Sequence, residues 1–136
     1  MSAYLKELGL FGFASWFRLQ AREEVEHGLK LFDYLIERNS FVTLKQIRTP
    51  EFEYNGIISI FNIVYDHEKC ITESVMKVAH LAEDECDRTT LSFIDWFITE
   101  QIEEEKNIKD IIKRLELFGD DNTSLYLMDK ELAERT

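Results

Sequence analysis

Residues 12–35 read GFASWFRLQAREEVEHGLKLFDYL, the clearest helical signal in the chain. The apolar residues of this stretch recur every three or four positions, which is the spacing of one face of a helix. Helix breakers are scarce, with five glycines and one proline in 136 residues. The pattern predicts a helix over residues 10–38, ending where Arg38 and Asn39 supply a cation and a suitable C-terminal residue.

Working outward, the same periodicity predicts an all-α chain that forms a single domain over residues 1–136. Further helices are expected over residues 55–83 and 88–118, with a short helix over 123–134 and about two helical turns over 1–8. Residues 40–54 break the period, and Thr49-Pro50 is expected to be extended or turn-like. So long a connection favours parallel rather than antiparallel packing of the helices that it joins. Gly119-Asp120-Asp121-Asn122 carries a helix-end signal followed by a helix-start signal.

Each long helix has an apolar face that is interrupted by polar residues near its middle. The predicted inward faces are Phe13, Phe17, Gln20, Glu24, His27, Leu31 and Leu35; then Ile57, Phe61, Val64, Glu68, Ile71, Val75, Val78 and Ala82; then Leu91, Ile94, Phe97, Gln101, Glu104, Ile108, Ile111 and Leu115. A carboxylate in a bundle core is costly unless it is paired or bound to a metal. Three helices with this feature at a similar depth can share one cation site.

Glu24 and His27 form a Glu-x-x-His pair, whose members share a helix face. A lone histidine on an apolar face is more often a core residue than a ligand, but here carboxylates interrupt two other helices as well. Oxygen-rich ligation with one imidazole suits iron. The remaining histidines, His67 and His80, are predicted to be non-ligands because they fall off the inward face. A second acidic cluster is either a solvated face or an auxiliary cation site; it comprises Glu23, Glu100, Glu103 and Glu104.

The charge balance also favours cations as ligands. The chain has 27 acidic and 16 basic residues, a net charge of −11, which disfavours nucleic acid and anionic membranes as partners. Cys70 and Cys86 form no CxxC pair and are predicted to be buried or partly buried free thiols. No apolar run approaches the roughly 18 residues that span a bilayer. The first residues do not resemble a signal peptide, so a cytoplasmic location is expected.

Several segments closely resemble non-haem prokaryotic ferritins, and the likeness extends over essentially the whole chain. They are residues 12–35, quoted above, YDHEKCITESV at 65–75, FIDWFITEQIEEEKNIKDIIKRL at 93–115, and SLYLMDKELA at 124–133. The resemblance implies a ferritin-like four-helix bundle with a long crossover connection and a short C-terminal helix. It also implies self-association into a 24-subunit shell, and oxidation of Fe(II) to Fe(III) by oxygen or peroxide at a di-iron centre.

The resemblance implies a role for each candidate residue. Glu24 would bridge two irons, His27 would ligate the first iron, and Glu68 and Glu104 would hold the second, with Gln101 nearby. The third iron site of some prokaryotic members is matched by Glu23, Glu100, Glu103 and Glu104. Haem is not expected, because Gln101-x-x-Glu104 stands where bacterioferritins have a second Glu-x-x-His, and no haem-ligating methionine is evident.

At the N-terminus the chain departs from the family pattern. Ferritins begin with a long helix that brings another glutamate to the first iron, and residues 1–8 resemble only the end of that helix. The first iron would then have too few protein ligands, and one side of the bundle would be uncovered. Three explanations are open: a misassigned start codon, a short chain whose open face a partner subunit covers, or a degenerate member that oxidises iron poorly.

Two functional hypotheses follow for the chain as it stands. It is either a storage subunit with ferroxidase activity, or a truncated ferritin subunit that binds and assembles with little turnover. A di-iron oxidase of the rubrerythrin kind is a weaker third hypothesis, because the chain has no CxxC segment of the rubredoxin type. The missing part of the first helix would remove ligands of the first iron, so it affects iron oxidation more than iron binding.

Overall fold

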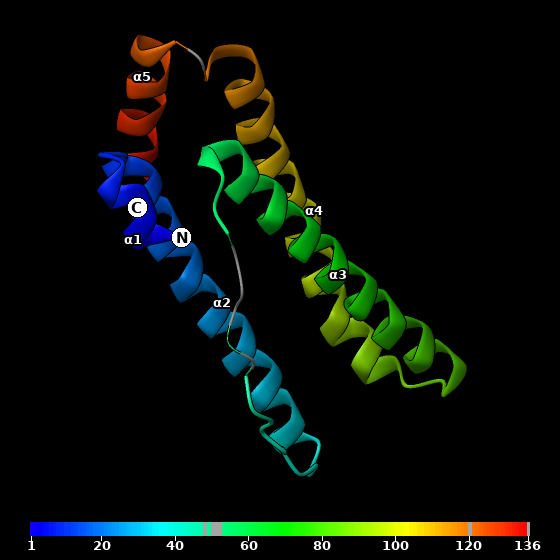
Figure 1. Ribbon diagram of the computed structural model, residues 1–136. Helices are drawn as coiled ribbons and strands as arrows, with labels where there is room; N and C mark the ends of the chain where they lie inside the picture. The colour runs from blue at the N-terminus through cyan, green and yellow to red at the C-terminus, as the bar shows by residue number, and fades with distance from the viewer. Residues whose placement is uncertain (48, 50–52, 120, 136) are drawn as a thin grey trace. The chain divides into compact units, whose positions relative to one another are not determined.

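The computed structural model describes residues 1–47, 49, 53–119 and 121–135. Within these residues the chain is all-helical and has no strand (Figure 1). The helices are α1 (Ser2–Glu7), α2 (Phe11–Glu37), α3 (Gly56–Asp84), α4 (Arg88–Phe118) and α5 (Asn122–Ala133). The prediction of an all-α fold is confirmed, and each helix ends within one residue of its predicted bounds. The predicted turn at Pro50 and the Asp120 part of the predicted cap lie outside the described residues.

The chain divides into two compact units. One unit comprises Met1–Glu53 and Asn122–Thr136, and the other comprises Tyr54–Asp121. The first contains α1, α2 and α5, and the second contains α3 and α4. The single domain over residues 1–136 and the parallel packing of α2 and α3 both stay predictions.

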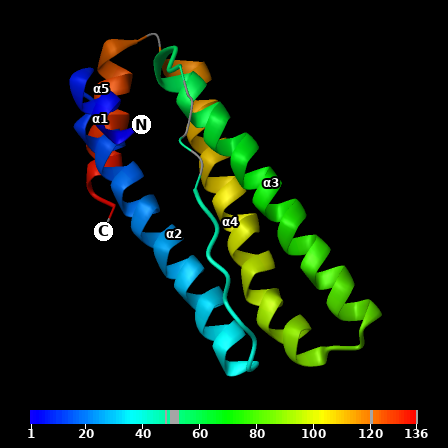
Figure 2. The ribbon, with the colours of Figure 1, turned by 60° about the horizontal axis from the view of Figure 1, so that its bottom comes forward.

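In the first unit, α1 and α5 lie beside the N-terminal part of α2 (Figures 1 and 2). Gly12 allows α5 to approach closely, because a Cβ atom at this position would overlap the carbonyl oxygen of Asp129. The side chain of Asp129 accepts a hydrogen bond of 2.9 Å from the Phe13 backbone N–H. That N–H belongs to the first turn of α2, where no backbone acceptor of the same helix is available. α5 therefore both packs against α2 and satisfies its N-terminus.

The predicted inward face of α2 is buried only along its first half. Phe13, Phe17 and Gln20 are buried, whereas Leu31 and Leu35 are 42% and 38% exposed, so their prediction as core residues was wrong. The helices packed on α2 within this unit are short, with 6 residues in α1 and 12 in α5, against 27 in α2. At 1.5 Å per residue they cover less than the length of α2.

In the second unit, α3 and α4 form an antiparallel hairpin (Figures 1 and 2). Its core cluster is Val75, Ala79, Ile94 and Phe97. α4 buries the predicted inward residues from Ile94 to Leu115. Val78 was predicted to be inward but is 44% exposed. The neighbouring Ala79 takes the inward position instead, and adjacent helical residues point about 100° apart.

The turn between α3 and α4 explains one of the two cysteines. Cys86 has a φ of 55°, and its N–H bonds the carbonyl of Glu83 at 3.0 Å, while the Asp87 N–H bonds that of Ala82 at 2.8 Å. This is the left-handed ending that commonly closes a helix. Cys86 is exposed there, and Cys70 is exposed on α3, so the prediction of buried or partly buried thiols was wrong, although both are free.

No helix in the described part of the chain combines the length and the apolar character that crossing a membrane requires.

Candidate metal centre

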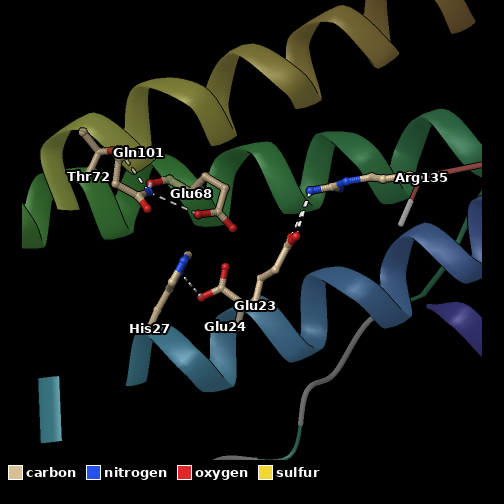
Figure 3. A network of polar contacts seen from close by, with 7 residues as sticks. All are labelled: Glu23, Glu24, His27, Glu68, Thr72, Gln101 and Arg135. Carbon is tan, nitrogen blue, oxygen red and sulfur yellow. Dashed lines mark hydrogen bonds and ion pairs between the residues drawn. The ribbon is translucent and has the colours of Figure 1, made fainter. Parts of the chain in front are cut away.

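Glu24 and His27 lie one helical turn apart in the middle of α2. The Nδ1 atom of His27 is 3.7 Å from a carboxylate oxygen of Glu24 (Figure 3). The side chains are 16% and 41% exposed for His27 and Glu24 respectively. The spacing therefore brings an imidazole nitrogen and a carboxylate oxygen to one face of α2, as the Glu-x-x-His pattern predicts.

In the α3–α4 hairpin, Glu68 and Gln101 are both buried, at 5% and 4% exposure. The Gln101 amide nitrogen donates to the Glu68 carboxylate at 3.2 Å and to the Glu68 backbone carbonyl at 3.3 Å (Figure 3). The same nitrogen lies 3.4 Å from the hydroxyl of Thr72. These contacts fix the amide with its nitrogen toward Glu68, so that Gln101 orients a carboxylate that is largely removed from water.

Thr72 extends this network toward the surface. Its hydroxyl donates to the carboxylate of Glu105 at 2.8 Å, and Lys109 is 3.4 Å from the other oxygen of Glu105. The hydrogen bond between Lys109 and Tyr65 raises the pKa of Lys109, and Glu105 adds to this rise. Lys109 therefore partners both Tyr65 and Glu105 at the outer end of the network. Sequence patterns did not reveal Thr72 or Glu105 as supports of Gln101.

The other predicted residues of α4 differ in exposure. Glu104 is buried at 6% exposure, one turn after Gln101 on the inward face of the helix. Glu100 is half-buried and Glu103 is exposed, as are His67 and His80 on α3. Across the described ranges, no group of three or more His, Cys, Asp or Glu side chains is arranged so that it could hold a metal ion. The complete ligand set, which takes residues from both units, stays a prediction.

Glu23 has a partner that the sequence did not reveal. Arg135, which follows α5, places its Nη2 atom 3.0 and 3.2 Å from the two carboxylate oxygens of Glu23 (Figure 3). Its Nη1 atom donates to the side-chain oxygen of Gln20 at 2.6 Å. A predicted metal ligand is thus held by a guanidinium of the same chain.

The Gln101–Glu68 contact leads to a prediction about stability. We expect Gln101→Leu to lower the free energy of unfolding by about 1–3 kcal/mol, because it removes a donor from a buried carboxylate. Urea unfolding monitored by circular dichroism measures this change. The double variant Glu68→Leu/Gln101→Leu should recover most of the loss, since an apolar pair can replace a buried polar pair. A single variant as stable as the parent would show that Gln101 does not support Glu68.

Comparisons with known proteins define the class to which this helical fold and its buried carboxylates belong. The ferritin-like domain family matches residues 1–118, so the chain belongs to that family. Among curated relatives, the bacterial non-heme ferritin of Staphylococcus epidermidis is 37% identical over 136 residues, which cover all of this chain and 82% of the relative. The bacterial non-heme ferritin of Escherichia coli O6:H1 is 37% identical over 133 residues, which cover 98% of this chain and 81% of the relative.

A solved structure supports the same assignment. The open-pore ferritin of the hyperthermophilic archaeon Archaeoglobus fulgidus is similar to this chain with a TM-score of 0.97 and 37% identity. The similarity covers all of this chain and 84% of the archaeal chain. The resemblance to non-haem prokaryotic ferritins is confirmed, and so is the ferritin-like fold.

Proposed function

We propose that this protein is an iron-storage subunit that binds Fe(II) through Glu24, His27, Glu68 and Glu104. The observation that carries the proposal is the burial of Glu68 and Glu104 within the α3–α4 hairpin of a ferritin-family chain. A buried carboxylate loses its hydration, so a cation bound by these two side chains would stabilise their charged form. Fe(II) suits this donor set, because it accepts carboxylate oxygen and imidazole nitrogen together.

Each residue has a role in this proposal. Glu24 would bind both Fe(II) ions, and His27 would bind the first of them through a ring nitrogen. Glu68 and Glu104 ligate the second iron, and Gln101 keeps the Glu68 carboxylate oriented by the hydrogen bond of 3.2 Å. Such a support commonly changes metal affinity 10- to 100-fold when it is removed. Glu23, Glu100 and Glu103, together with Glu104, form an auxiliary third iron site.

The reaction that we propose is ferroxidation. Two Fe(II) ions each lose one electron, and dioxygen takes up both electrons and two protons to give hydrogen peroxide. With peroxide as the oxidant, the same two electrons and two protons give two molecules of water. The carboxylates hold the Fe(III) product because anionic oxygen donors favour the higher charge. The net charge of −11 attracts Fe(II) toward the protein.

An assembly role with little turnover is the alternative. It is favoured by the exposed apolar side chains of α2, which offer a surface for a second subunit; they include Val25, Leu29, Phe32 and Ile36. In either case we propose self-association into a shell of 24 subunits, as in the family. Two free cysteines suit a reducing compartment, and a cytoplasmic location is part of the proposal.

Stopped-flow mixing of Fe(II) with the aerated protein tests the ferroxidase proposal. We expect a rapid rise in Fe(III) absorbance that is lost in Glu24→Ala and His27→Ala, because both variants remove donors from the first iron. Glu26→Ala is a matched control, since it removes an exposed carboxylate from the same helix. A parent protein no faster than the two ligand variants would refute ferroxidation. Anaerobic Fe(II) binding to that parent would then leave storage as the function, and gel filtration would report its assembly.

A further inference from the structure

Arg135 is held by three side chains of α2. Its guanidinium contacts both carboxylate oxygens of Glu23 through Nη2 and the Gln20 oxygen through Nη1. It also lies 5.4 Å from the ring centroid of Trp16. Trp16 and Gln20 are 2% and 8% exposed. Glu23 and Arg135 are about half-buried, with side chains 40% and 30% exposed.

This arrangement uses properties that are particular to arginine. A guanidinium is planar, so it can lie near an indole while its separate N–H groups reach two different acceptors. Hydrogen bonds between an ionised donor and an ionised acceptor are about twice as strong as neutral ones. Lysine would supply the charge, but its single ammonium could not satisfy Gln20 and Glu23 in the same planar geometry. The contact is therefore specific in shape as well as in charge.

The pairing conflicts with the use of Glu23 as a metal ligand. Both oxygens of its carboxylate are within 3.2 Å of one guanidinium nitrogen. An Fe(II) ion that binds the same oxygens must either displace Arg135 or sit beside a fixed positive charge, and like charges at such separations repel. We infer that Arg135 is a positioning residue that occupies Glu23 in the metal-free protein and weakens Fe(II) binding at the auxiliary site. This inference rests on the proposed function, because it concerns the third iron site.

The same contact has a purely structural interpretation, in which Arg135 only fastens α5 to α2. Under that interpretation, loss of Arg135 lowers stability and leaves Fe(II) binding unchanged. Competition for Glu23 instead requires that loss of Arg135 strengthens Fe(II) binding and that Glu23 is needed for the gain. Measurements of metal affinity therefore distinguish the two interpretations, while measurements of stability do not.

The test is anaerobic titration calorimetry of the full chain with Fe(II). We expect Arg135→Gln to tighten Fe(II) binding at the auxiliary site by about 10-fold, the scale of one charge-assisted hydrogen bond. Adding Glu23→Gln to that variant should abolish the gain. Lys130→Gln removes an equal charge from α5, where Lys130 lies over the ring of Tyr126, and should change affinity less than about 2-fold because it is an exposed charge. Arg135→Lys keeps the charge and should fall between the parent and Arg135→Gln.

Several results would overturn the inference. The first is an Fe(II) affinity at the auxiliary site that is unchanged or lower in Arg135→Gln. The second is an equal increase in Fe(II) affinity in Lys130→Gln. The third is an increase in affinity that remains when Glu23→Gln is added to Arg135→Gln. If Arg135→Gln fails to fold, the Fe(II) affinity of Arg135→Lys is the test. An affinity equal to that of the parent would then overturn the inference. Failure of the proposed function looks different: the parent would then bind no Fe(II) in a manner that depends on Glu24 and His27. If the parent binds Fe(II) through Glu24 and His27 but substitution of Arg135 leaves the affinity unchanged, only the role of Arg135 is refuted.

Discussion

Glu68→Gln is expected to weaken Fe(II) binding by at least about 100-fold while leaving the metal-free protein at least as stable as the parent. Loss of a residue that merely supports a ligand already costs 10- to 100-fold in affinity, and Glu68 is proposed to be a ligand itself. The stability expectation comes from its burial at 5% exposure, since a buried carboxylate loses its hydration. Glutamine has the same shape and can still accept a hydrogen bond from Gln101, so the packing is preserved.

Anaerobic Fe(II) titration and urea unfolding of the same preparations measure the two quantities. Glu73→Gln is the matched control, because it makes the same chemical change on the exposed side of α3 and should alter neither quantity appreciably. A variant that unfolds more easily and binds Fe(II) normally would mean that Glu68 serves the fold through Gln101. The proposal of a metal ligand at this position would then be abandoned.

Gly12→Ala is expected to lower the free energy of unfolding by about 3 kcal/mol, the upper range for overpacking a well-packed site. A Cβ atom at this position would overlap the backbone carbonyl of Asp129, and backbone cannot move aside as the end of a flexible side chain can. α5 would have to shift away from α2. The hydrogen bond from Phe13 to Asp129 and the contact between Arg135 and Glu23 should weaken with it.

Gly28→Ala provides the internal control for this prediction. Gly28 lies in the same helix, and a Cβ atom there would meet nothing within 4 Å. Alanine should therefore stabilise the protein by about 1 kcal/mol or less, because it favours the helix more than glycine does. Urea unfolding of both variants compares the two positions directly. Equal effects at positions 12 and 28 would show that α5 does not pack against Gly12 as described.

Much of the secondary structure could be read from local patterns. The course of α2 and α4 and the buried face of α4 follow from apolar residues spaced three or four apart, because a helix brings such residues to one side. Their C-terminal ends follow from the helix-end residues Asn39 and Gly119. The same periodicity gave wrong results at Leu31, Leu35 and Val78. A helical period tells which residues share a face, but it does not tell how far along that face another element extends.

In the candidate site, too, some features were visible in the sequence and others only in the tertiary structure. Glu24, His27, Glu68, Gln101 and Glu104 stood out because polar residues interrupt apolar faces, and that signal lies within each helix. The contact of Gln101 with Glu68 spans 33 residues and depends on how α3 pairs with α4. Its neighbours Thr72 and Glu105 have ordinary helical surroundings in the sequence, so nothing in the local pattern distinguishes them.

By itself the sequence determined the helices, the polar interruptions of their inward faces and membership of the ferritin-like family. Only the tertiary structure decided what surrounds Gly12 and Glu23, because their partners Asp129 and Arg135 lie more than a hundred residues further along the chain. The hydrogen bond from Phe13, next to Gly12, to Asp129 spans 116 residues, and the contact of Glu23 with Arg135 spans 112. Periodicity reflects interactions between residues within a few positions of each other. A contact made by folding α5 back on α2 leaves no such periodic signal, and it is this contact that gives Glu23 a guanidinium as its partner.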